Sequence, residues 1–282
     1  WIAYLLTLSP ELTLQDSGEL AVGSFYAGVP HPPGYPVWTL YTWLWTVLLP
    51  VGNIALRVAV GEATAGAIAC GLLGIMVSRG SSMLVEGIEE LKSMTGKWEN
   101  AICIVSGFVA GLMMGFNGFV WSQSVIVEVY LFGVLSFMIV LLCLLRWIYA
   151  PHQMRYAYWA LFMFGICFTN HQSLIVAAIG VEVTIAAGNW KLGRDVFFGN
   201  FVIYMLYNCV SLYTGEHIFR NLGAKPGLLL IFHGVGIGSL IASCWLAAKT
   251  KGFLSEWLRV VILGALWIAG AAFYFYMPIS GM

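Results

Sequence analysis

Charged side chains are scarce in this sequence. Lysine, arginine, aspartate and glutamate together account for 9% of its 282 residues, whereas hydrophobic residues account for 60%. A soluble domain carries about 25% charged residues, so the composition excludes an ordinary soluble fold. The mean hydropathy of +0.87 instead predicts an all-α polytopic membrane protein. The formal net charge is zero, which leaves no basic excess for binding nucleic acid.

The sequence also lacks the motifs of several common chemistries. Its six cysteines stand singly in apolar runs, so neither a zinc site nor a disulfide framework is predicted, and they are interpreted as small hydrophobic residues. Walker, GxSxG and HExxH motifs are missing, which leaves ATP-driven transport and serine or zinc hydrolysis unsupported. No ligand spacing demands a metal, so no metal ligand is assigned and metal dependence stays open.

Long apolar runs dominate the chain. A bilayer core takes about 20 apolar residues per helix. The sequence therefore predicts spans near residues 57–78, 100–121, 125–145, 156–170, 173–189, 195–213, 226–247 and 260–277. Residues 1–9 are too short to span and are interpreted as the end of a truncated first helix. Residues 1–282 are thus expected to form a single transmembrane domain of about nine spans, with the C-terminal part of a longer protein missing.

Residues 10–56 are predicted to form an extracytoplasmic loop. It begins with the polar-rich stretch 10–36 and continues into residues 37–49, VWTLYTWLWTVLL, which are too short for a comfortable span. Their tryptophan content predicts an interfacial or re-entrant helix. Residues 79–99 contain LVEGIEELKSM, with apolar residues at helical spacing, and predict a short surface helix.

The basic residues predict the orientation. If the 10–56 loop faces outward, ten lysines and arginines fall in inside loops and only Arg57, Arg220 and Lys225 fall outside. This asymmetry follows the positive-inside rule. The scarce polar residues Asp16, Glu19, His31, Glu62, Glu128, Asn170 and His171 are then expected to converge on the outer face.

Asp16 and Glu19 are three residues apart, so on a helix they share a face. One interpretation makes Asp16 a general base at the membrane surface, with Glu19 tuning it or binding substrate. The other makes them a capping box, with Asp16 as the N-cap and Glu19 at the third position of a helix through Ala27. Spacing alone favours the capping box, and the two interpretations are compatible.

Four further residues have both a functional and a structural interpretation. His31 lies between prolines and either donates to a phosphate or hydrogen-bonds its own loop. Arg57 either binds a lipid phosphate or extends to the headgroups. Asn170 and His171 either line a site or cap the next helix. His233, inside a predicted span, is interpreted as a histidine that packs or forms an interhelical hydrogen bond.

Glu128 lies in SVIVEVYLF, within the predicted span 125–145. Acids inside a membrane are costly, so a functional or paired role is the default, the alternative being that Glu128 reaches interfacial water. The same argument applies more weakly to Glu62 and Glu182, which lie close to the ends of their predicted helices.

The sequence resembles a known family at several motifs. These are DSGE, GVPHPPGYPVWTL, LLPVGNIALRV, WSQSVIVEVYLF, TNHQS and FYFYMPIS, which occur in the same order from about residue 10 to the end. They are similar to polytopic proteins of the GT-C superfamily, whose eukaryotic members act as protein O-mannosyltransferases and whose bacterial members are mostly of undefined function. The resemblance implies a GT-C-like helix bundle with an acidic residue in the first extracytoplasmic loop.

The resemblance also implies a reaction. A sugar, expected to be mannose, would pass from a polyprenyl or dolichyl phosphate donor to a hydroxyl of a protein, glycan or lipid, with inversion. Asp16 would be the base and Glu19 its companion. The residues implied to line the donor and acceptor cleft are His31, Arg57, Glu128, Tyr130, Asn170 and His171. The site would face the periplasm or exterior in a bacterium, or the lumen of the endoplasmic reticulum in a eukaryote.

Two other classes remain open from the residues themselves. A transporter or lipid-handling protein would use Glu128 and Glu182 as intramembrane sites. A scaffolding subunit would depend on no single polar residue. Glycosyl transfer ranks first because the polar residues are expected on one outer face, whereas a transporter should place some at mid-membrane.

Overall fold

The computed structural model describes residues 1–13, 16–91, 96–215 and 226–280, and every regular element among them is a helix. The chain divides into two compact units. Unit 1 comprises residues 1–145, 159–175 and 266–282, and unit 2 comprises residues 146–158 and 176–265. Three helices, α7 (Tyr130–Tyr149), α8 (Met154–Asn170) and α13 (Trp257–Ala271), contribute residues to both units.

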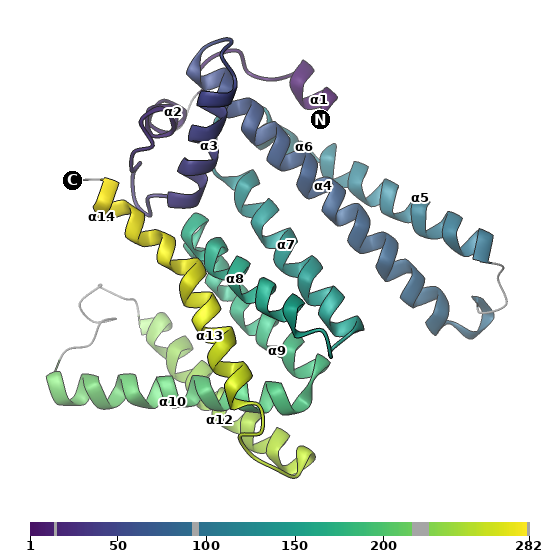
Figure 1. The fold of residues 1–282 in the computed structure, drawn as a ribbon, viewed down its shortest axis with the longest axis vertical. Helices are drawn as coiled ribbons and strands as arrows, with labels where there is room; N and C mark the ends of the chain where they lie inside the picture. Colours follow the sequence, from purple (N-terminus) through teal and green to yellow (C-terminus); the bar gives the residue numbers. More distant parts are fainter. Residues whose placement is uncertain (14–15, 92–95, 216–225, 281–282) are drawn as a thin grey trace. The chain divides into compact units, whose positions relative to one another are not determined.

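Each of the remaining helices drawn in Figure 1, except η2, lies within a single unit. Unit 1 contains α1 (Ile2–Leu6), α2 (Ser17–Tyr26), α3 (Pro36–Leu48), α4 (Ile54–Gly87), η1 (Glu89–Leu91), α5 (Gly96–Gly115), α6 (Gly118–Ser124), η3 (Ala272–Phe275) and α14 (Tyr276–Ser280). Unit 2 contains α9 (Ala178–Gly188), α10 (Trp190–Thr214) and α12 (Pro226–Thr250). The short helix η2 (Gln172–Ala177) is divided between the units.

Six helical segments among the described residues are long and apolar enough to cross a membrane. They are Ile54–Gly87, Gly96–Gly115, Tyr130–Tyr149, Trp190–Thr214, Leu229–Thr250 and Trp257–Ile279. The expected spans 156–170 and 173–189 correspond to shorter apolar helices, Met154–Asn170 and Gln172–Gly188. The expected multi-pass architecture is confirmed at this coarser level, and the count of nine spans stays a prediction.

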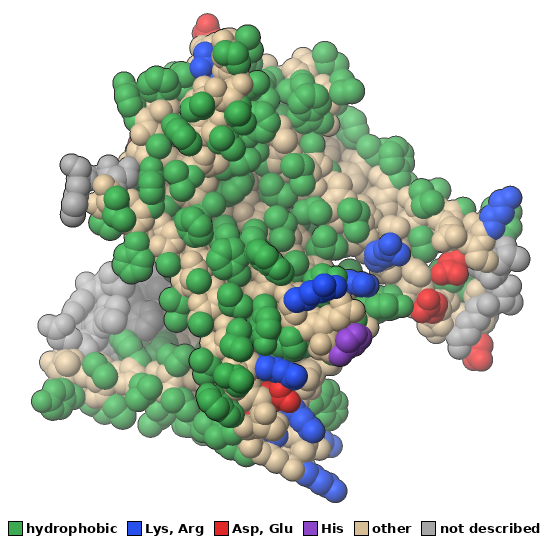
Figure 2. Space-filling view, viewed as in Figure 1, with side chains coloured by type: hydrophobic (Ala, Val, Ile, Leu, Met, Phe, Trp, Pro, Cys, Tyr) green, Lys and Arg blue, Asp and Glu red, His purple; other side chains and the backbone are tan. Residues whose placement is uncertain are grey.

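Apolar side chains cover most of the face shown in Figure 2, as expected for a surface in contact with lipid. Lysine and arginine side chains are few on this face and lie mostly in its lower and right-hand parts, including the region of the α12–α13 connection. This distribution is typical of helices whose middles contact acyl chains and whose ends reach the headgroups.

Two expectations about helix boundaries are wrong. The helix predicted to end at residue 78 continues without a break to Gly87, so most of the LVEGIEELKSM segment extends this helix or forms the single turn η1, in place of a separate surface helix. This stretch contains no proline, which would interrupt a helix, so α4 continues through it. The span predicted to begin at residue 125 instead begins at Tyr130, which leaves Glu128 in the non-helical connection after α6.

The connection that holds Glu128 has local causes. It contains three consecutive β-branched residues, Val125 to Val127, which have reduced helix propensity. The backbone carbonyl of Val125 accepts a hydrogen bond from the Ser9 amide at 2.8 Å, so it pairs with a distant segment rather than with its own helix. Glu128 is thereby placed outside the candidate spans.

Helix α3 packs along the first part of α4. Pro36 occupies the first turn of α3, where its missing amide proton costs nothing. The Tyr41 hydroxyl donates to the Gly61 carbonyl at 2.7 Å, and the Trp45 ring lies where a side chain at Gly61 would otherwise extend. The expected helix at residues 37–49 is therefore present, and one of its faces is buried against protein.

Helices α4 and α5 lie side by side (Figure 1) and approach closely at glycines. A Cβ atom added to Gly107 would lie 2.5 Å from the Gly74 carbonyl oxygen and 2.9 Å from Ser78 Cβ. Only residues without side chains permit such an approach, the usual way in which helices associate where lipid supplies no hydrophobic driving force.

In unit 2, α10 and α12 pack antiparallel through polar contacts at two levels. The Tyr204 hydroxyl and His233 Nδ1 are 2.8 Å apart, which confirms His233 as a histidine with an interhelical hydrogen bond. At the other level, Arg194 near the start of α10 donates to the Thr250 hydroxyl at the end of α12 at 2.9 Å. Arg194 is buried, whereas the sequence placed it in a basic loop.

Substitution of Gly107 by alanine should weaken the α4–α5 contact. Because the new methyl group would overlap the Gly74 carbonyl, the helices must separate, and we expect a loss of about 1–3 kcal/mol in the free energy of unfolding. The measurement is the apparent melting temperature in a nonionic detergent. Gly80→Ala in α4 is the control, since nothing lies within 4 Å of a Cβ atom there; equal melting temperatures for both variants would contradict the packing argument.

Candidate functional site

Helix α2 presents the two acidic residues that the sequence singled out. Asp16 occupies the N-cap position and Glu19 lies in the first turn, as predicted, but the Asp16 side chain makes no capping hydrogen bond. The predicted helix positions of Asp16 and Glu19 are therefore correct, but the Asp16 hydrogen bond that the capping-box interpretation requires is not formed. Neither carboxylate forms a capping hydrogen bond, and both lie near the same residue, His31.

His31 lies between these two carboxylates. Glu19 holds it in two ways: Glu19 Oε1 accepts from the His31 backbone amide at 2.6 Å, and Glu19 Oε2 lies 3.2 Å from His31 Nδ1. Asp16 Oδ2 lies 3.8 Å from the other ring nitrogen, Nε2. Because an ionised carboxylate only accepts, the contact with Glu19 places a proton on Nδ1 and leaves Nε2 facing Asp16.

Tyr35 was not among the residues predicted for the site, although it lies in the HPPGYP motif. Its hydroxyl is 3.4 Å from His31 Nε2, and the two rings meet edge to face with centroids 5.6 Å apart. Tyr35 has φ of 42° and ψ of 51°, a left-handed conformation that is uncommon for a residue with a side chain. Such strain collects at functional sites, but it depends on backbone geometry that residue identity does not reveal.

A buried pair lies below Tyr35. The Trp38 indole Nε1 donates to Glu62 Oε1 at 2.7 Å, and both residues have 0% exposure. Glu62 Oε2 accepts no hydrogen bond from the described residues. Trp38 and Tyr35 also meet edge to face, with ring centroids 6.4 Å apart. Glu62 is therefore linked to His31 through two aromatic residues that contact each other, Trp38 of α3 and Tyr35 of the preceding loop.

Glu128 belongs to the same cluster. Its side chain is buried and accepts from the Val129 amide at 3.1 Å. Burial raises the pKa of Glu128 above its ordinary value, the Asp16 carboxylate raises this pKa further, and the Val129 amide and His31 lower it. Glu128 and Asp16 also contribute to a raised pKa of Tyr35, which is caused first by burial and next by Tyr130. Val127 and Val129, on either side of Glu128, pack in one hydrophobic cluster with Trp38 and Tyr35, which places Glu128 in the same neighbourhood.

Tyr130 connects this neighbourhood to the TNHQS segment. Its ring centroid is 5.9 Å from that of His171, whose Nδ1 contacts the Ser173 hydroxyl at 2.6 Å. Asn170 is buried instead: its Nδ2 donates to the Ser136 hydroxyl at 3.1 Å, and its Oδ1 accepts nothing among the described residues. His171 thus lies toward the cluster, whereas Asn170 faces the helices of unit 1.

Arg57 is engaged elsewhere. Its guanidinium donates to three backbone carbonyls, those of Thr46, Val51 and Gly52, at 3.0 to 3.3 Å. These carbonyls lie at the end of α3 and in the turn before α4, so Arg57 satisfies acceptors that the helix end leaves unpaired. The structure does not bring Arg57 into the cluster around His31, and its binding of substrate stays a prediction.

Two residues near the end of the described chain, Tyr276 and Met277, contact the loop that carries His31. The Tyr276 hydroxyl donates to the Ala27 carbonyl, and the Met277 side chain fills the space where a Cβ atom at Gly34 would lie. The YMPIS motif therefore lies beside GVPHPPG, and the assignment of both segments to the outer face stays a prediction.

The cluster is an acidic one with a single imidazole. No group of three His, Cys, Asp or Glu side chains within the described ranges is arranged to hold a metal ion. The arrangement can hold and move a proton at His31, and it can donate hydrogen bonds from Tyr35 and Tyr130 to an oxygen-rich ligand.

Together these observations define a class: an all-helical, multi-pass membrane protein with a carboxylate–histidine cluster outside its candidate spans. Residues 16–193 match the family described as the protein O-mannosyl-transferase TMEM260 N-terminal domain, a match that begins at Asp16. The chain belongs to this family of glycosyltransferases, and the resemblance predicted from the sequence is confirmed.

Two curated relatives carry the same name. The chain is 36% identical to protein O-mannosyl-transferase TMEM260 of Mus musculus over 118 residues, which is 39% of this chain and 17% of the relative. It is 23% identical to protein O-mannosyl-transferase tmem260 of Dictyostelium discoideum over 276 residues, which is 92% of this chain and 29% of the relative. The chain thus spans less than a third of either relative. No solved structure matches it.

Replacing Trp38 by phenylalanine should destabilise unit 1. The Glu62 carboxyl would lose its described donor while staying buried, which costs about 1–3 kcal/mol in the free energy of unfolding. The measurement is the apparent melting temperature in detergent. Trp43→Phe, at a position with 38% exposure, is the matched control. Adding Glu62→Met to Trp38→Phe should recover part of the loss, and no recovery would argue against the hydrogen bond as its cause.

Glu128 should make stability depend on pH. Its folded-state pKa lies above the ordinary value, so its favourable contribution is present at acid pH and is lost as pH rises through the folded-state pKa. Glutamine resembles the protonated acid and still accepts from the Val129 amide. Glu128→Gln should therefore gain stability over wild type as pH increases from acid to neutral. A difference in melting temperature that stays constant over this range would refute the assignment.

Proposed function

We propose that this chain is the catalytic membrane part of a mannosyltransferase that uses a polyprenyl or dolichyl phosphate sugar and a protein hydroxyl. The observation that carries the proposal is the convergence of Asp16 and Glu19 on His31 at the start of the family match. The family name supports mannose and a protein acceptor. The lipid phosphate donor is supported by the GT-C resemblance and by the position of the cluster next to the candidate spans.

The two carboxylates have different roles in this proposal. Both oxygens of Glu19 are engaged with His31, so Glu19 is the positioning residue for the imidazole. Asp16 is 62% exposed at its side chain, and its described contact is the longer one to His31 Nε2. Asp16 therefore keeps lone pairs available for an incoming hydroxyl, which is what a general base requires.

The reaction proceeds as one displacement. The acceptor hydroxyl oxygen attacks the anomeric carbon, the bond from that carbon to the phosphate oxygen breaks, and the lipid phosphate leaves with the electron pair. Asp16 takes the hydroxyl proton. Attack from the side opposite the phosphate inverts the anomeric centre. The leaving phosphate is already an anion, so it needs hydrogen-bond donors more than an acid. Tyr35, Tyr130 and His171 supply such donors.

An apolar groove gives the lipid chain of the donor a place to bind. It runs along α2 and the start of α4, and it is lined by Glu11, Leu12, Gly18, Ala21, Val22, Phe25, Tyr26, Asn53, Ile54 and Ala55. Gly18 lies between Asp16 and Glu19 in the first turn of α2 and on the edge of this groove. A polyprenyl chain in the groove would bring its phosphate toward the cluster.

The side of the membrane follows from charge. Arg194 is buried, but nine of the ten basic residues assigned to inside loops still stand against three outside. We therefore assign the cluster to the extracytoplasmic side. The transporter alternative uses Glu128 as an intramembrane site, and the position of Glu128 in the connection before α7 favours glycosyl transfer over it.

The test uses membrane vesicles that contain the protein, supplied with radiolabelled polyprenyl phosphate mannose. We expect Asp16→Asn to lower the rate of label transfer to protein by about 10²–10⁴-fold, the usual loss on removing a general base. Glu19→Gln should lower it less, because the amide oxygen still accepts from the His31 backbone. Glu86→Gln is the control, an exposed acid in α4 that lies outside both the cluster and the groove.

The outcomes separate the elements of the proposal. Transfer that survives Asp16→Asn would refute Asp16 as the base and make Glu128 the next candidate. Label recovered in glycan or lipid fractions instead of protein would refute the proposed acceptor. Uptake of a substrate into vesicles without transfer, with sensitivity to Glu128→Gln, would support the transporter alternative.

A further inference from the structure

Three lysines at one end of unit 2 are exposed and lie beyond ion-pair distance of every acid in the described part of the chain. They are Lys191, Lys249 and Lys251. The described acids of unit 2 have other partners. Asp195 pairs with Arg194 and Glu256 with Arg259, while Glu182 accepts from Asn200. The lysines therefore form a positive patch without internal neutralisation.

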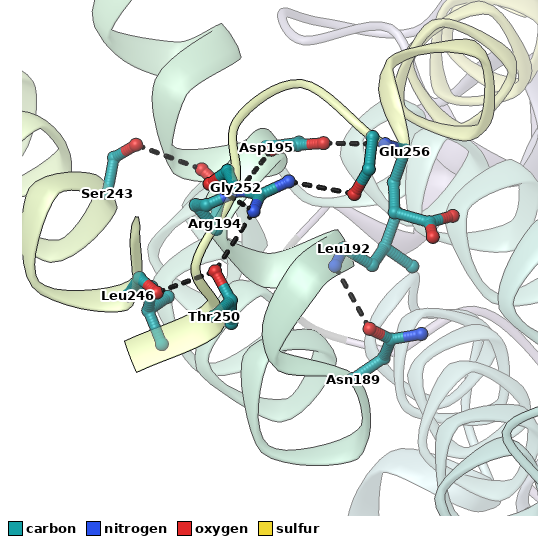
Figure 3. Close-up of polar contacts among 10 residues, drawn as sticks. Asn189, Leu192, Arg194, Asp195, Ser243, Leu246, Thr250, Gly252 and Glu256 are labelled. Atoms are coloured by element: carbon teal, nitrogen blue, oxygen red, sulfur yellow. Dashed lines mark hydrogen bonds and ion pairs between the residues drawn. The ribbon is translucent and has the colours of Figure 1, made fainter. Parts of the chain in front are cut away.

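A buried network around Arg194, drawn in Figure 3, joins the two chain segments that carry these lysines. Arg194 Nη1 donates to the Thr250 hydroxyl at 2.9 Å and to the Gly252 carbonyl at 2.5 Å, and Arg194 Nη2 donates to the Ser255 hydroxyl at 2.9 Å. Lys191 lies one helical turn before Arg194, while Lys249 and Lys251 flank Thr250. The network thus fixes the start of α10 against the end of α12 and the connection that follows.

Asp195 completes the network. Its Oδ1 lies 2.6 Å from Arg194 Nε, and its Oδ2 accepts from the Glu256 amide at 2.7 Å (Figure 3). The Ser243 hydroxyl also donates to the Arg194 carbonyl at 3.1 Å. The Arg194 guanidinium thus donates four hydrogen bonds, and each Asp195 carboxylate oxygen accepts one. The two buried charges neutralise each other and leave the lysine charges unopposed.

Two tryptophans border the lysines. The rings of Trp190 and Trp245 lie 6.1 Å apart, and Lys249 Nζ is 6.0 Å from the Trp245 ring. Trp190 is 49% exposed and Trp245 is 57% exposed. Indole rings beside lysines are typical of the interface between acyl chains and headgroups, where the ring has an apolar body and a polar N–H.

The patch also lies at the right depth for headgroups. Lys191 is the second residue of the candidate span Trp190–Thr214, and Lys249 is the last but one of the candidate span Leu229–Thr250. Both spans therefore end at the patch, and the rest of their length lies in the acyl region. A partner that contacts this end from within the bilayer is a lipid.

We propose that Lys191, Lys249 and Lys251, with Trp190 and Trp245, form a binding site for the phosphate headgroup of an anionic phospholipid. The lysines supply the charge, and the tryptophans supply a surface for the glycerol and upper acyl carbons. The site is separate from the carboxylate–histidine cluster, all of whose residues belong to unit 1. It binds a lipid that stays bound and is not consumed.

Native mass spectrometry of the purified chain in a nonionic detergent tests this site. The protein is titrated with phosphatidylglycerol or with phosphatidylcholine, as wild type and as the triple variant Lys191→Gln, Lys249→Gln and Lys251→Gln. We expect the triple variant to bind phosphatidylglycerol more weakly by roughly fivefold for each lysine removed. Binding of phosphatidylcholine should be unchanged, and salt should weaken only the phosphatidylglycerol complex of wild type.

The control removes the same charge elsewhere, through Arg79→Gln, Lys97→Gln and Arg155→Gln. This variant should bind phosphatidylglycerol as wild type does. The proposal is overturned if the two triple variants lose affinity equally, if neither loses it, or if phosphatidylcholine binds wild type as tightly. Because all three lysines are exposed, the melting temperature without added lipid should not change. The measurement is of lipid binding, so its failure is independent of whether the chain transfers mannose.

Discussion

The absence of water from the bilayer core is the constraint on which this structure depends. A polar group that enters the core must find a partner within the protein, because no solvent is there to replace it. The helices satisfy the backbone, and several buried polar side chains form pairs that join helices. Trp38 joins α3 to Glu62 of α4, Tyr204 joins α10 to His233 of α12, and Arg194 joins α10 to the end of α12.

The same constraint explains the gradation around the candidate site. Asp16 is exposed and keeps open lone pairs, Glu19 is engaged with His31, and Glu62 is fully buried with a donor on one oxygen. Tyr35 and Trp38 lie between the exposed and the buried ends. The exposed carboxylate of Asp16 therefore lies where water can reach it, and the buried groups beneath this loop lie where water cannot.

Much of this arrangement could be predicted from the sequence. Apolar run length located the long helices, because span length is set by bilayer thickness. The scarcity of charge made Asp16, Glu19, His31 and Glu128 conspicuous, and they do lie together. Helix ends were less predictable, since the end of α4 and the start of α7 depend on local pairing rather than on composition.

The residues that were missed are missed for physical reasons. Tyr35 is one of thirteen tyrosines, and only its left-handed backbone and its contact with His31 distinguish it. The burial of Arg194 depends on partners more than fifty residues away. Conversely, Arg57 resembled a phosphate ligand in sequence, but its guanidinium satisfies the end of α3.

The Arg194 network also bears on the order in which the chain enters the membrane. Its partners beyond Asp195 lie 56 to 61 residues later in the sequence. While α10 is being inserted, those partners have not yet been synthesised, and an unpaired guanidinium in lipid is costly. The adjacent Asp195, whose carboxylate is 2.6 Å from Arg194, neutralises it from the moment both residues emerge. Asp195 thus neutralises the Arg194 charge until the later partners of Arg194 are synthesised with the following helix.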